Sequence, residues 1–288
     1  MRPHTPRWWT VPPRPRRTRA RTWTTALALT CAGLALQLPA APADAPHAGE
    51  SWQQRKVTHF VVNYVGDAEE AQSVADEAEA AYQRLHDDLG FRKVDDFWLW
   101  DRRVRIFIYP TREKYIAATR SPAWSGGKAR GDTREIDTYR RSGGFLTTIL
   151  PHEITHLMFH DFMGFETEAP QWLHEGLAQW QDHAGRKSFH MTSRVLVLNG
   201  LAIPLGILIR MDVRTVTQTG IAVAYYTEAA SVVGFLLETR GADEFRELCR
   251  HLKEGKDLDA ALRFTYKEKM ANIGELEKVW KQYLETVQ

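Results

Sequence analysis

Cysteine is scarce in this sequence, with only Cys31 and Cys249 among 288 residues. Cys31 lies in an apolar N-terminal stretch, and removal of that stretch would leave Cys249 alone. A single cysteine cannot form an internal disulfide, which excludes the small, disulfide-stapled folds of many secreted proteins. The chain is long enough to bury a substantial hydrophobic core, so we expect its stability to come from that core.

A hydrophobic run long enough to suggest a membrane span is also lacking at the N-terminus. The apolar run from Ala26 to Leu38 is shorter than the roughly 20 residues that a spanning helix needs. Seven arginines precede it, and small residues with prolines follow it, a pattern typical of a secretory signal. We therefore predict that residues 1–45 are an export signal and that the protein is periplasmic, cell-envelope or secreted. An uncleaved N-terminal anchor and a disordered Arg/Pro-rich tail are the alternatives, and we expect membrane association only through this segment.

An excess of positive charge is missing once that leader is set aside. The whole chain has 38 basic and 36 acidic side chains, but residues 46–288 have 31 and 35, a net charge of −4 with neutral histidines. Nucleic-acid-binding proteins concentrate Lys and Arg to match the phosphate backbone. The composition therefore gives no support for a nucleic acid partner.

Residues 50–142 alternate between β-branched or aromatic segments and amphipathic ones. The expected strands are 57–64, 104–109 and 135–140, and the expected helices are 68–89 and 112–119. Residues 121–131 contain a proline and adjacent glycines, so we expect a loop there. Strands that alternate with helices in this way predict a small mixed sheet packed on helices.

Residues 143–288 have the apolar periodicity of helices. Pro151 either begins or kinks the first of them, because proline lacks the backbone N–H. We expect residues 195–208 to form core-lining turns, since a glycine and a proline interrupt this apolar segment. The other expected helices are 170 to about 183, 222–239 closed by Gly241, 243–253 and 272–284. The sequence thus predicts one α+β domain over residues 50–288, with an α/β part at 50–142 followed by a helical part.

The segment His152-Glu153-Ile154-Thr155-His156 lies near the start of the helical part. Residues four apart share a helix face, so His152 and His156 can direct their rings to one point. Such a pair is typical of two zinc ligands, with Glu153 placed to hold the nucleophilic water. Eighteen residues separate His156 from Glu175, enough for a turn and a second helix that returns a carboxylate. Two histidines and one glutamate leave a fourth position open, as in catalytic sites, so we predict a hydrolase with one Zn²⁺ per chain, at the join of the two parts.

This motif, with Glu175 at that distance, resembles the gluzincin metallopeptidases. Trp172-Leu173-His174-Glu175-Gly176-Leu177-Ala178 is similar to the Trp-Leu-Asn-Glu-Gly-Phe-Ala segment of the aminopeptidase-N-like branch, with His174 in place of asparagine. The closest likeness is to the bacterial peptidase-MA-like proteins, over about residues 55–285. The resemblance implies a thermolysin-like, gluzincin catalytic domain with the zinc site between a small mixed sheet region and a helical region.

The resemblance also implies a mechanism and a substrate class. His152, His156 and Glu175 would hold the zinc, Glu153 would act as general base, and the substrate would be a peptide or protein. Tyr226 aligns with a family tyrosine that stabilises the oxyanion; the adjacent Tyr225 is the alternative, and a tyrosine packed in the core is the non-catalytic interpretation.

Zinc-bound histidines usually give their second ring N–H to a carboxylate or carbonyl. The family's acidic residue one turn after the glutamate ligand is replaced here by Gln179, so we name Gln179 and Asp182 as candidate partners, with a backbone carbonyl as the alternative. The side chain of His174 projects from the helix in a different direction from that of Glu175, and we expect it to contact solvent or substrate.

One family feature is absent from the sequence. Aminopeptidases of this branch bind a free N-terminus with a Gly-Ala-Met-Glu-Asn segment, which this chain lacks; Asp132 falls nearest to its glutamate. Aminopeptidase activity is therefore not implied, while an endopeptidase, a peptidase with one narrow substrate and another amide hydrolase stay open. The alternative of a different class is a catalytically inactive gluzincin-fold binding or scaffold protein of the cell envelope.

Overall fold

The computed structural model describes residues 47, 50–89, 98–121, 125–140, 145–164, 169–182 and 184–287. Contacts divide the chain into two units, Met1–Ala48 and Gly49–Gln288, and the second contains every helix and strand given below. The predicted export segment, residues 1–45, lies outside the described residues.

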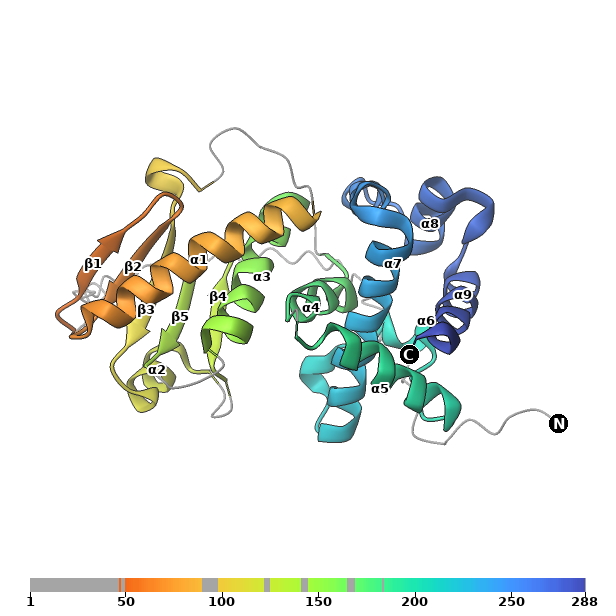
Figure 1. Ribbon diagram of the computed structural model, residues 1–288, viewed down its shortest axis with the longest axis horizontal. Coiled ribbons are helices and arrows are strands. Elements are labelled where there is room, and N and C mark those ends of the chain that lie inside the picture. Colours follow the sequence, from red (N-terminus) through yellow and green to blue (C-terminus); the bar gives the residue numbers. More distant parts are fainter. Residues whose placement is uncertain are drawn as a thin grey trace, which may run out of the picture. The chain divides into compact units, whose positions relative to one another are not determined.

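Among the described residues, five strands form one mixed sheet in the order β1-β2-β3-β5-β4 (Figure 1). The strands are β1 Gln53–Lys56, β2 Phe60–Tyr64, β3 Val104–Tyr109, β4 Gly127–Arg130 and β5 Glu135–Tyr139. Strands β2, β3 and β5 run parallel, and β1 and β4 pair antiparallel at the two edges. The prediction of a small mixed sheet is confirmed.

The two edge strands are the part of the sheet that the sequence does not predict. The expected loop at 121–131 is wrong over Gly127–Arg130, which forms β4. The segment Gly-Lys-Ala-Arg lacks the β-branched and aromatic residues that indicate a strand. Its strand conformation comes from antiparallel pairing with β5, and this short strand borders the candidate site.

Two helices accompany the sheet and have the predicted bounds, α1 Ala68–Leu89 and α2 Arg112–Thr119. α1 turns an apolar face of alanine, valine and leucine toward β2 and the motif-bearing helix α3, Leu150–Met163. The Thr111 hydroxyl accepts a hydrogen bond from Lys114 N at the start of α2. Arg120, in the left-handed conformation with φ 53°, ends α2 through a bond from its N–H to Ile116 O.

The helix that carries the motif begins with an irregular turn. A π-helical segment, Phe145–Ile149, leads directly into α3. Pro151 is the second residue of α3 and follows the π-helical segment without a break in the helical run. The change from π- to α-helical geometry lies directly before this proline, which has no backbone N–H to give to a regular helix. α4, Gln171–Trp180, follows Pro170 and packs against α3 and α7, ending before the expected residue 183.

Further helices complete the fold. They are α5 Arg186–Leu198, α6 Leu205–Leu208, α7 Thr219–Lys253, α8 Leu258–Tyr266 and α9 Ile273–Thr286, with a 3₁₀ turn at Val213–Thr215. Gly241, with φ 81°, interrupts α7 where the sequence predicts one helix to close before another begins. The mixed α+β architecture is as predicted, although α5 and α8 were not expected.

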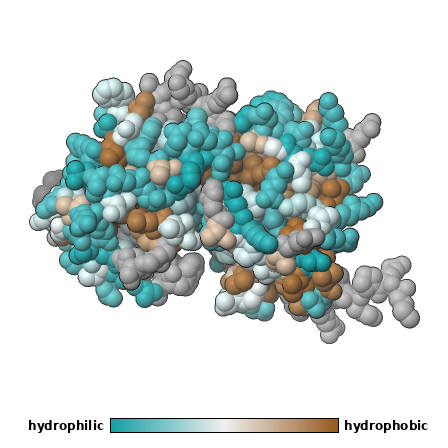
Figure 2. Space-filling model, in the orientation of Figure 1, coloured by the Kyte–Doolittle hydropathy of each residue, from teal (hydrophilic) through white to brown (hydrophobic). Residues whose placement is uncertain are grey.

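The interpretation of residues 195–208 as core-lining turns is wrong at its N-terminal end. Val195 and Leu198 belong to the last turns of α5 and are 55% and 69% exposed, and Leu201 beyond them is 54% exposed. Figure 2 shows hydrophobic surface over this end of α5. Ile203, Leu205 and Leu208 are buried as expected. Hydrophobicity alone does not separate these two groups, because apolar side chains also occur on protein surfaces.

Among the described residues, α7 is the one helix long and apolar enough to cross a membrane. Its most apolar 18-residue window is 67% buried inside the fold, as in the core helix of a soluble protein. α4, α5 and α8 pack against it. Its apolar character is therefore accounted for by packing within the protein.

Candidate metal centre and surrounding cleft

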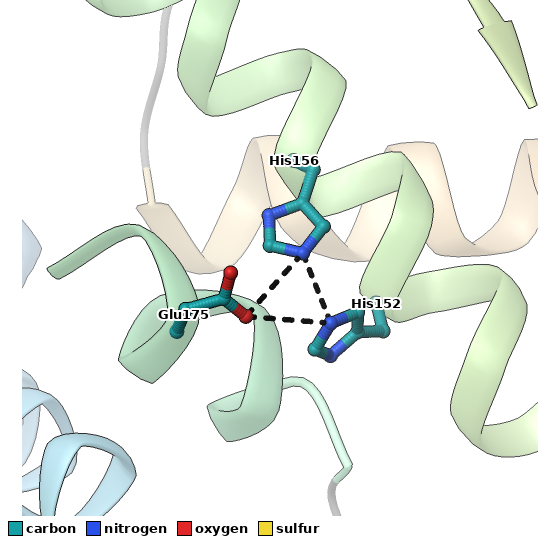
Figure 3. Close-up of side chains that lie close together, drawn as sticks. All are labelled: His152, His156 and Glu175. Atoms are coloured by element: carbon teal, nitrogen blue, oxygen red, sulfur yellow. Dashed lines mark hydrogen bonds and ion pairs between the residues drawn. The ribbon is translucent and has the colours of Figure 1, made fainter. Parts of the chain in front are cut away.

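Three side chains from two helices converge on one point (Figure 3). His152 and His156 project from α3 and Glu175 from α4. The two Nε2 atoms are 3.0 Å apart, and Glu175 Oε2 lies 3.9 Å from His152 Nε2 and 3.7 Å from His156 Nε2. Among the described residues, these form the one group of at least three His, Cys, Asp or Glu side chains close enough to share a metal ion. The structure thus brings together all three ligands named from the sequence.

Both histidines are held in the form that can coordinate a metal. Burial, followed by the nearby His174, lowers the pKa of His152 to about 4, against the opposing effect of the Ala178 carbonyl. Burial, with the neighbouring imidazoles of His152 and His174, also holds the pKa of His156 well below its ordinary value. Neutral imidazoles have a nitrogen lone pair to offer, so no proton has to leave before a cation binds at neutral pH.

Glu175 is the negatively charged member of the group. Burial raises the pKa of its carboxyl to about 7, and the positive charge of Arg214 opposes that shift. A cation between the carboxylate and the two histidines would favour the ionised form strongly. The group therefore combines two neutral nitrogen donors with an acid whose burial is best compensated by a bound cation.

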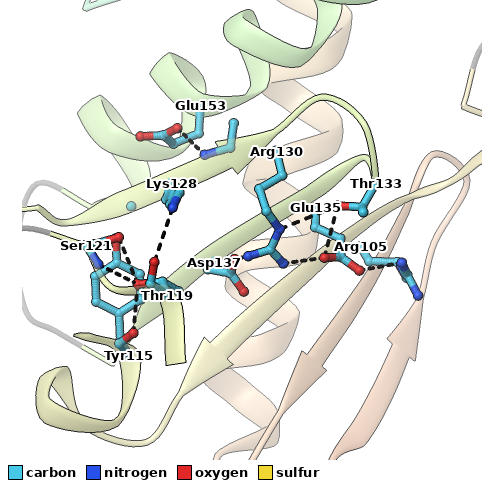
Figure 4. A network of polar contacts seen from close by, with 12 residues as sticks. Arg105, Tyr115, Thr119, Ser121, Lys128, Arg130, Thr133, Glu135, Asp137 and Glu153 are labelled. Carbon is cyan, nitrogen blue, oxygen red and sulfur yellow. Dashed lines mark hydrogen bonds and ion pairs between the residues drawn. The ribbon is translucent and has the colours of Figure 1, made fainter. Parts of the chain in front are cut away.

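Glu153 lies beside these residues and faces strand β4 (Figure 4). Its Oε2 accepts a hydrogen bond from Ala129 N at 2.8 Å. Burial, followed by the charges of Glu175 and Asp137, raises the pKa of Glu153 to about 7, and the Ala129 bond opposes this. Gly127 leaves room for the side chain, since a Cβ there would lie 3.1 Å from Glu153 Cγ. A carboxyl group with a pKa near neutrality can both accept and return a proton.

Ion pairs between strands hold β4 in position (Figure 4). Arg130 of β4 pairs with Glu135 and Asp137 of β5, and Arg105 of β3 pairs with Glu135. At the other end of β4, Ser125 Oγ donates a hydrogen bond to Gly127 O at 2.7 Å. These contacts fix the strand whose backbone bonds to Glu153.

A cleft of about 580 Å³ opens over the metal-ligand candidates and Glu153. It is large enough for a few residues of a peptide. Its lining comes from the residues that follow α2, from β4 and the residue after it, from α3 and α4, from the 3₁₀ turn at Val213–Thr215 and from α7. The lining residues are Arg120, Ser121, Ser125, Gly127, Lys128, Ala129, Gly131, His152, Glu153, His156, Leu157, His160, His174, Glu175, Arg214 and Tyr226.

The two candidate tyrosines occupy different environments. Tyr226 lines the cleft, and burial followed by the nearby charge of Glu175 raises the pKa of its hydroxyl to about 12. Tyr225 is fully buried, and its hydroxyl has no hydrogen-bond partner among the described residues. Of the two, Tyr226 is therefore the one that can reach a bound molecule, and it keeps its proton throughout the neutral range.

No contact described in the structure joins Gln179 or Asp182, the candidate partners named from the sequence, to the two metal-ligand histidines. Asp182 Oδ1 accepts a hydrogen bond from Gly185 N, at the turn into α5, and neither side chain lines the cleft. The His152 ring instead interacts with the backbone carbonyl of Ala178, the alternative raised from the sequence.

His174 lines the cleft, but it also contacts a metal-ligand candidate directly. Its ring centroid lies 4.4 Å from that of His156, and its Nε2 is 3.3 Å from the His156 carbonyl oxygen. The expectation that it contacts solvent or substrate therefore leaves out its packing role. Asp132 is exposed, is not among the cleft-lining residues, and accepts a hydrogen bond from Thr133 N.

Several cleft residues were not singled out from the sequence. They are Ala129, which bonds to Glu153, and the basic residues Arg120, Lys128 and Arg214. Ala129 acts through its backbone N–H, so its residue type carries no signal. The three basic residues lie in separate elements, and nothing in their sequence neighbourhoods indicates that they share one cleft.

Comparison with known proteins agrees with this arrangement. The model of the peptidase MA superfamily matches residues 77–286, which include α3, α4, α7 and every residue of the candidate metal centre. No curated protein matches the chain in sequence. The match covers well over half of the chain and points to a peptidase of the metallopeptidase kind. This chain belongs to the peptidase MA superfamily.

Proposed function

We propose that this protein is a zinc-dependent metallopeptidase of the gluzincin type, with a thermolysin-like catalytic domain related to the aminopeptidase-N-like branch. The observation that carries the proposal is the convergence of His152, His156 and Glu175, with donor atoms within 4.8 Å of one another. Superfamily membership and the position of Glu153 beside this group support it.

The donor set fits zinc in type and in size. Two imidazoles and one carboxylate, with a fourth position left for solvent or substrate, are typical of catalytic zinc sites. Ligands about 2.0–2.1 Å from a tetrahedral ion lie about 3.3 Å from one another. The separations of 3.0, 3.7 and 3.9 Å bracket that value. When bound, zinc would polarise the scissile carbonyl and make a water molecule more acidic.

The side chains then divide the proton transfers and charge stabilisation between them. Glu153 takes the proton of the attacking water at its carboxylate and delivers it to the leaving amine nitrogen. Its pKa of about 7 suits both the uptake and the release of that proton at neutral pH. The Tyr226 hydroxyl donates a hydrogen bond to the oxyanion that forms on the substrate carbonyl. Among the described residues β4 pairs only with β5. The backbone groups of its other edge that do not bond to Glu153 or Ser125 can pair with an extended peptide.

We further propose that the enzyme acts outside the cytoplasm on a peptide or protein substrate, exported or anchored through residues 1–45. The arginine-rich start, the apolar run and the small residues after it support export. Fractionation of cells, with N-terminal sequencing of the protein recovered, tests this proposal. Recovery in the cytoplasm with an intact N-terminus would contradict it.

The test of function combines metal analysis with one substitution. Purified protein should contain about one zinc per chain, and it should cleave members of a mixed peptide library, as read by mass spectrometry. Glu153→Gln should retain zinc and abolish cleavage, because the amide cannot take the proton. Folded protein that binds no zinc would refute the metal site. Zinc-loaded protein without cleavage would instead favour the inactive scaffold, and equal cleavage by both forms would refute the role of Glu153.

A further inference from the structure

Positive charge is concentrated in the cleft of a chain whose residues 46–288 carry a net charge of −4. Arg120, Lys128 and Arg214 line the cleft from three different elements. The only acidic side chains in its lining, among the described residues, are Glu153 and Glu175. Those two face the metal centre, so the rest of the lining presents cations and no carboxylate to a bound substrate.

Two of the cations lie on segments that a hydrogen bond joins to each other. Lys128 Nζ donates a hydrogen bond to Thr119 O at 3.2 Å, and Thr119 directly precedes Arg120 (Figure 4). Both side chains are exposed to solvent. Within the described part of the chain, no carboxylate forms an ion pair with either of them, whereas most other arginines of this region are paired.

Arg214 contributes less to the charge available for a ligand. It stands beside Glu175 on the helical side of the cleft, and Asp212 binds its guanidinium at 2.8 and 2.9 Å. That pairing neutralises much of its charge. The unneutralised positive charge therefore lies with Arg120, at the end of α2, and Lys128, in β4.

Resting on the proposed peptidase function, we infer that the cleft selects substrates with a carboxylate close to the scissile bond, bound by Arg120 and Lys128. A substrate ammonium group would meet two cations there and no free acid. The carboxylate has two sources, an Asp or Glu side chain or the free C-terminus of the peptide. Both offer the same planar pair of oxygens to a guanidinium and an ammonium.

The test uses quenched fluorescent decapeptides on one uncharged frame. A single Glu, Gln or Lys is moved through the positions of the frame, and each peptide is made with a free and an amidated C-terminus. Zinc-loaded wild type should cleave the best Glu peptide with kcat/KM roughly tenfold higher than its Lys counterpart, with Gln between them. Preference for Glu in amidated peptides identifies a side-chain carboxylate, and preference for the free acid over the amide identifies the C-terminus. Equal kcat/KM across all of them overturns the inference.

Charge reversal assigns the effect to the two residues. Arg120→Glu/Lys128→Glu should invert the ratio of kcat/KM between Glu and Lys peptides. Lys56→Glu/Arg112→Glu changes the net charge by the same four units at two exposed residues outside the cleft, and this matched control should keep the wild-type ratio. An unchanged ratio in the double variant, or the same inversion in the control, refutes the role of Arg120 and Lys128.

Failure of the proposed function is separable from failure of this inference. If no peptide is cleaved, the peptidase proposal fails for this series, and binding decides the inference. Fluorescein-labelled Glu, Gln and Lys peptides are titrated with zinc-loaded Glu153→Gln protein and followed by anisotropy. Tighter binding of the Glu peptide, lost in the charge-reversed variant, supports the inference, and equal binding of all three overturns it.

Discussion

Gly176 of α4 lies directly against the backbone of Ala229 in α7. A Cβ added to Gly176 would be 2.5 Å from Ala229 O, closer than real side chains come to a carbonyl. Gly176 follows Glu175 in the chain, and Ala229 is three residues beyond Tyr226. This contact therefore sets how closely the helix with the carboxylate ligand approaches the helix with the cleft tyrosine.

Gly176→Ala should destabilise the protein, although helix propensity alone predicts a gain of about 0.5–1 kcal/mol. Separation of α4 from α7 should outweigh that gain and lower the free energy of unfolding by about 1–3 kcal/mol. Zinc affinity should fall as well, because Glu175 moves with α4. Gly220→Ala is the control, since a Cβ at Gly220 meets nothing within 4 Å. Denaturant unfolding and zinc titration measure both variants, and equal stabilities would contradict the packing argument.

Tyr226→Phe should impair catalysis, whereas Tyr225→Phe, at the adjacent residue, should not. Loss of the Tyr226 hydroxyl should lower kcat about 100- to 1000-fold with little change in KM, as expected for an oxyanion donor. The Tyr225 hydroxyl is buried without a hydrogen-bond partner among the described residues, so its removal should leave kcat unchanged and stability equal or higher. Steady-state kinetics on one zinc-loaded preparation of each variant decides this. A larger kcat loss in Tyr225→Phe would reassign the oxyanion donor.

Removal of zinc should lower the melting temperature. A metal at about 100 times its dissociation constant stabilises the folded state by about 2.7 kcal/mol, or roughly 5–10 °C for a domain of this size. Burial raises the pKa of Glu175 above its ordinary value of 4.5, to about 7, so the metal-free protein loses stability as pH rises between those values. The gain from zinc should therefore increase over that interval. Calorimetry with and without a chelator tests this, and Glu175→Ala should show no gain from zinc.

Glu228 predicts a second pH dependence, independent of the metal. Its fully buried carboxyl accepts a hydrogen bond from Ile203 N, with both oxygens at 3.1 Å, and burial raises its pKa to about 8. Because the folded state binds this proton more tightly, the stabilisation is complete below the ordinary pKa of 4.5 and is lost as pH rises toward 8. Glu228→Gln keeps an acceptor for Ile203 N and removes the titration. Unfolding free energies from pH 5 to 8 should fall less steeply in the variant, and equal slopes would contradict the prediction.

The metal-ligand candidates could be predicted because their signal is local. Residues 152 and 156 are fixed relative to each other by one turn of helix, whatever surrounds them. To predict Glu175 as a ligand, we needed only to assume that a second helix packs against the first, and the apolar pattern of both helices favours such packing. The partner of His152 could not be predicted from a side chain, because the contact is with the backbone carbonyl of Ala178.

Strand β4 and the surface of α5 show where local pattern fails. Strand formation in Gly127–Arg130 depends on β5 alongside it, a non-local partner that four residues cannot specify. Val195 and Leu198 have the composition of a core segment, yet they lie on the outer side of α5. In both cases the deciding contact is with an element distant in sequence, so only the folded arrangement reveals it.

The hydrogen bond between Ala129 N and Glu153 requires that Ala129 direct its N–H to the side of β4 that faces α3. Successive backbone N–H groups of a strand point to opposite sides, so Ala129 faces α3 while its neighbours Lys128 and Arg130 direct theirs toward β5. A shift of β4 by one residue against β5 would exchange the two sides and would turn this N–H away from the carboxylate. The hydrogen bond that Glu153 accepts therefore depends on the register of the β4–β5 pair, which the ion pairs of Arg130 with Glu135 and Asp137 help to hold.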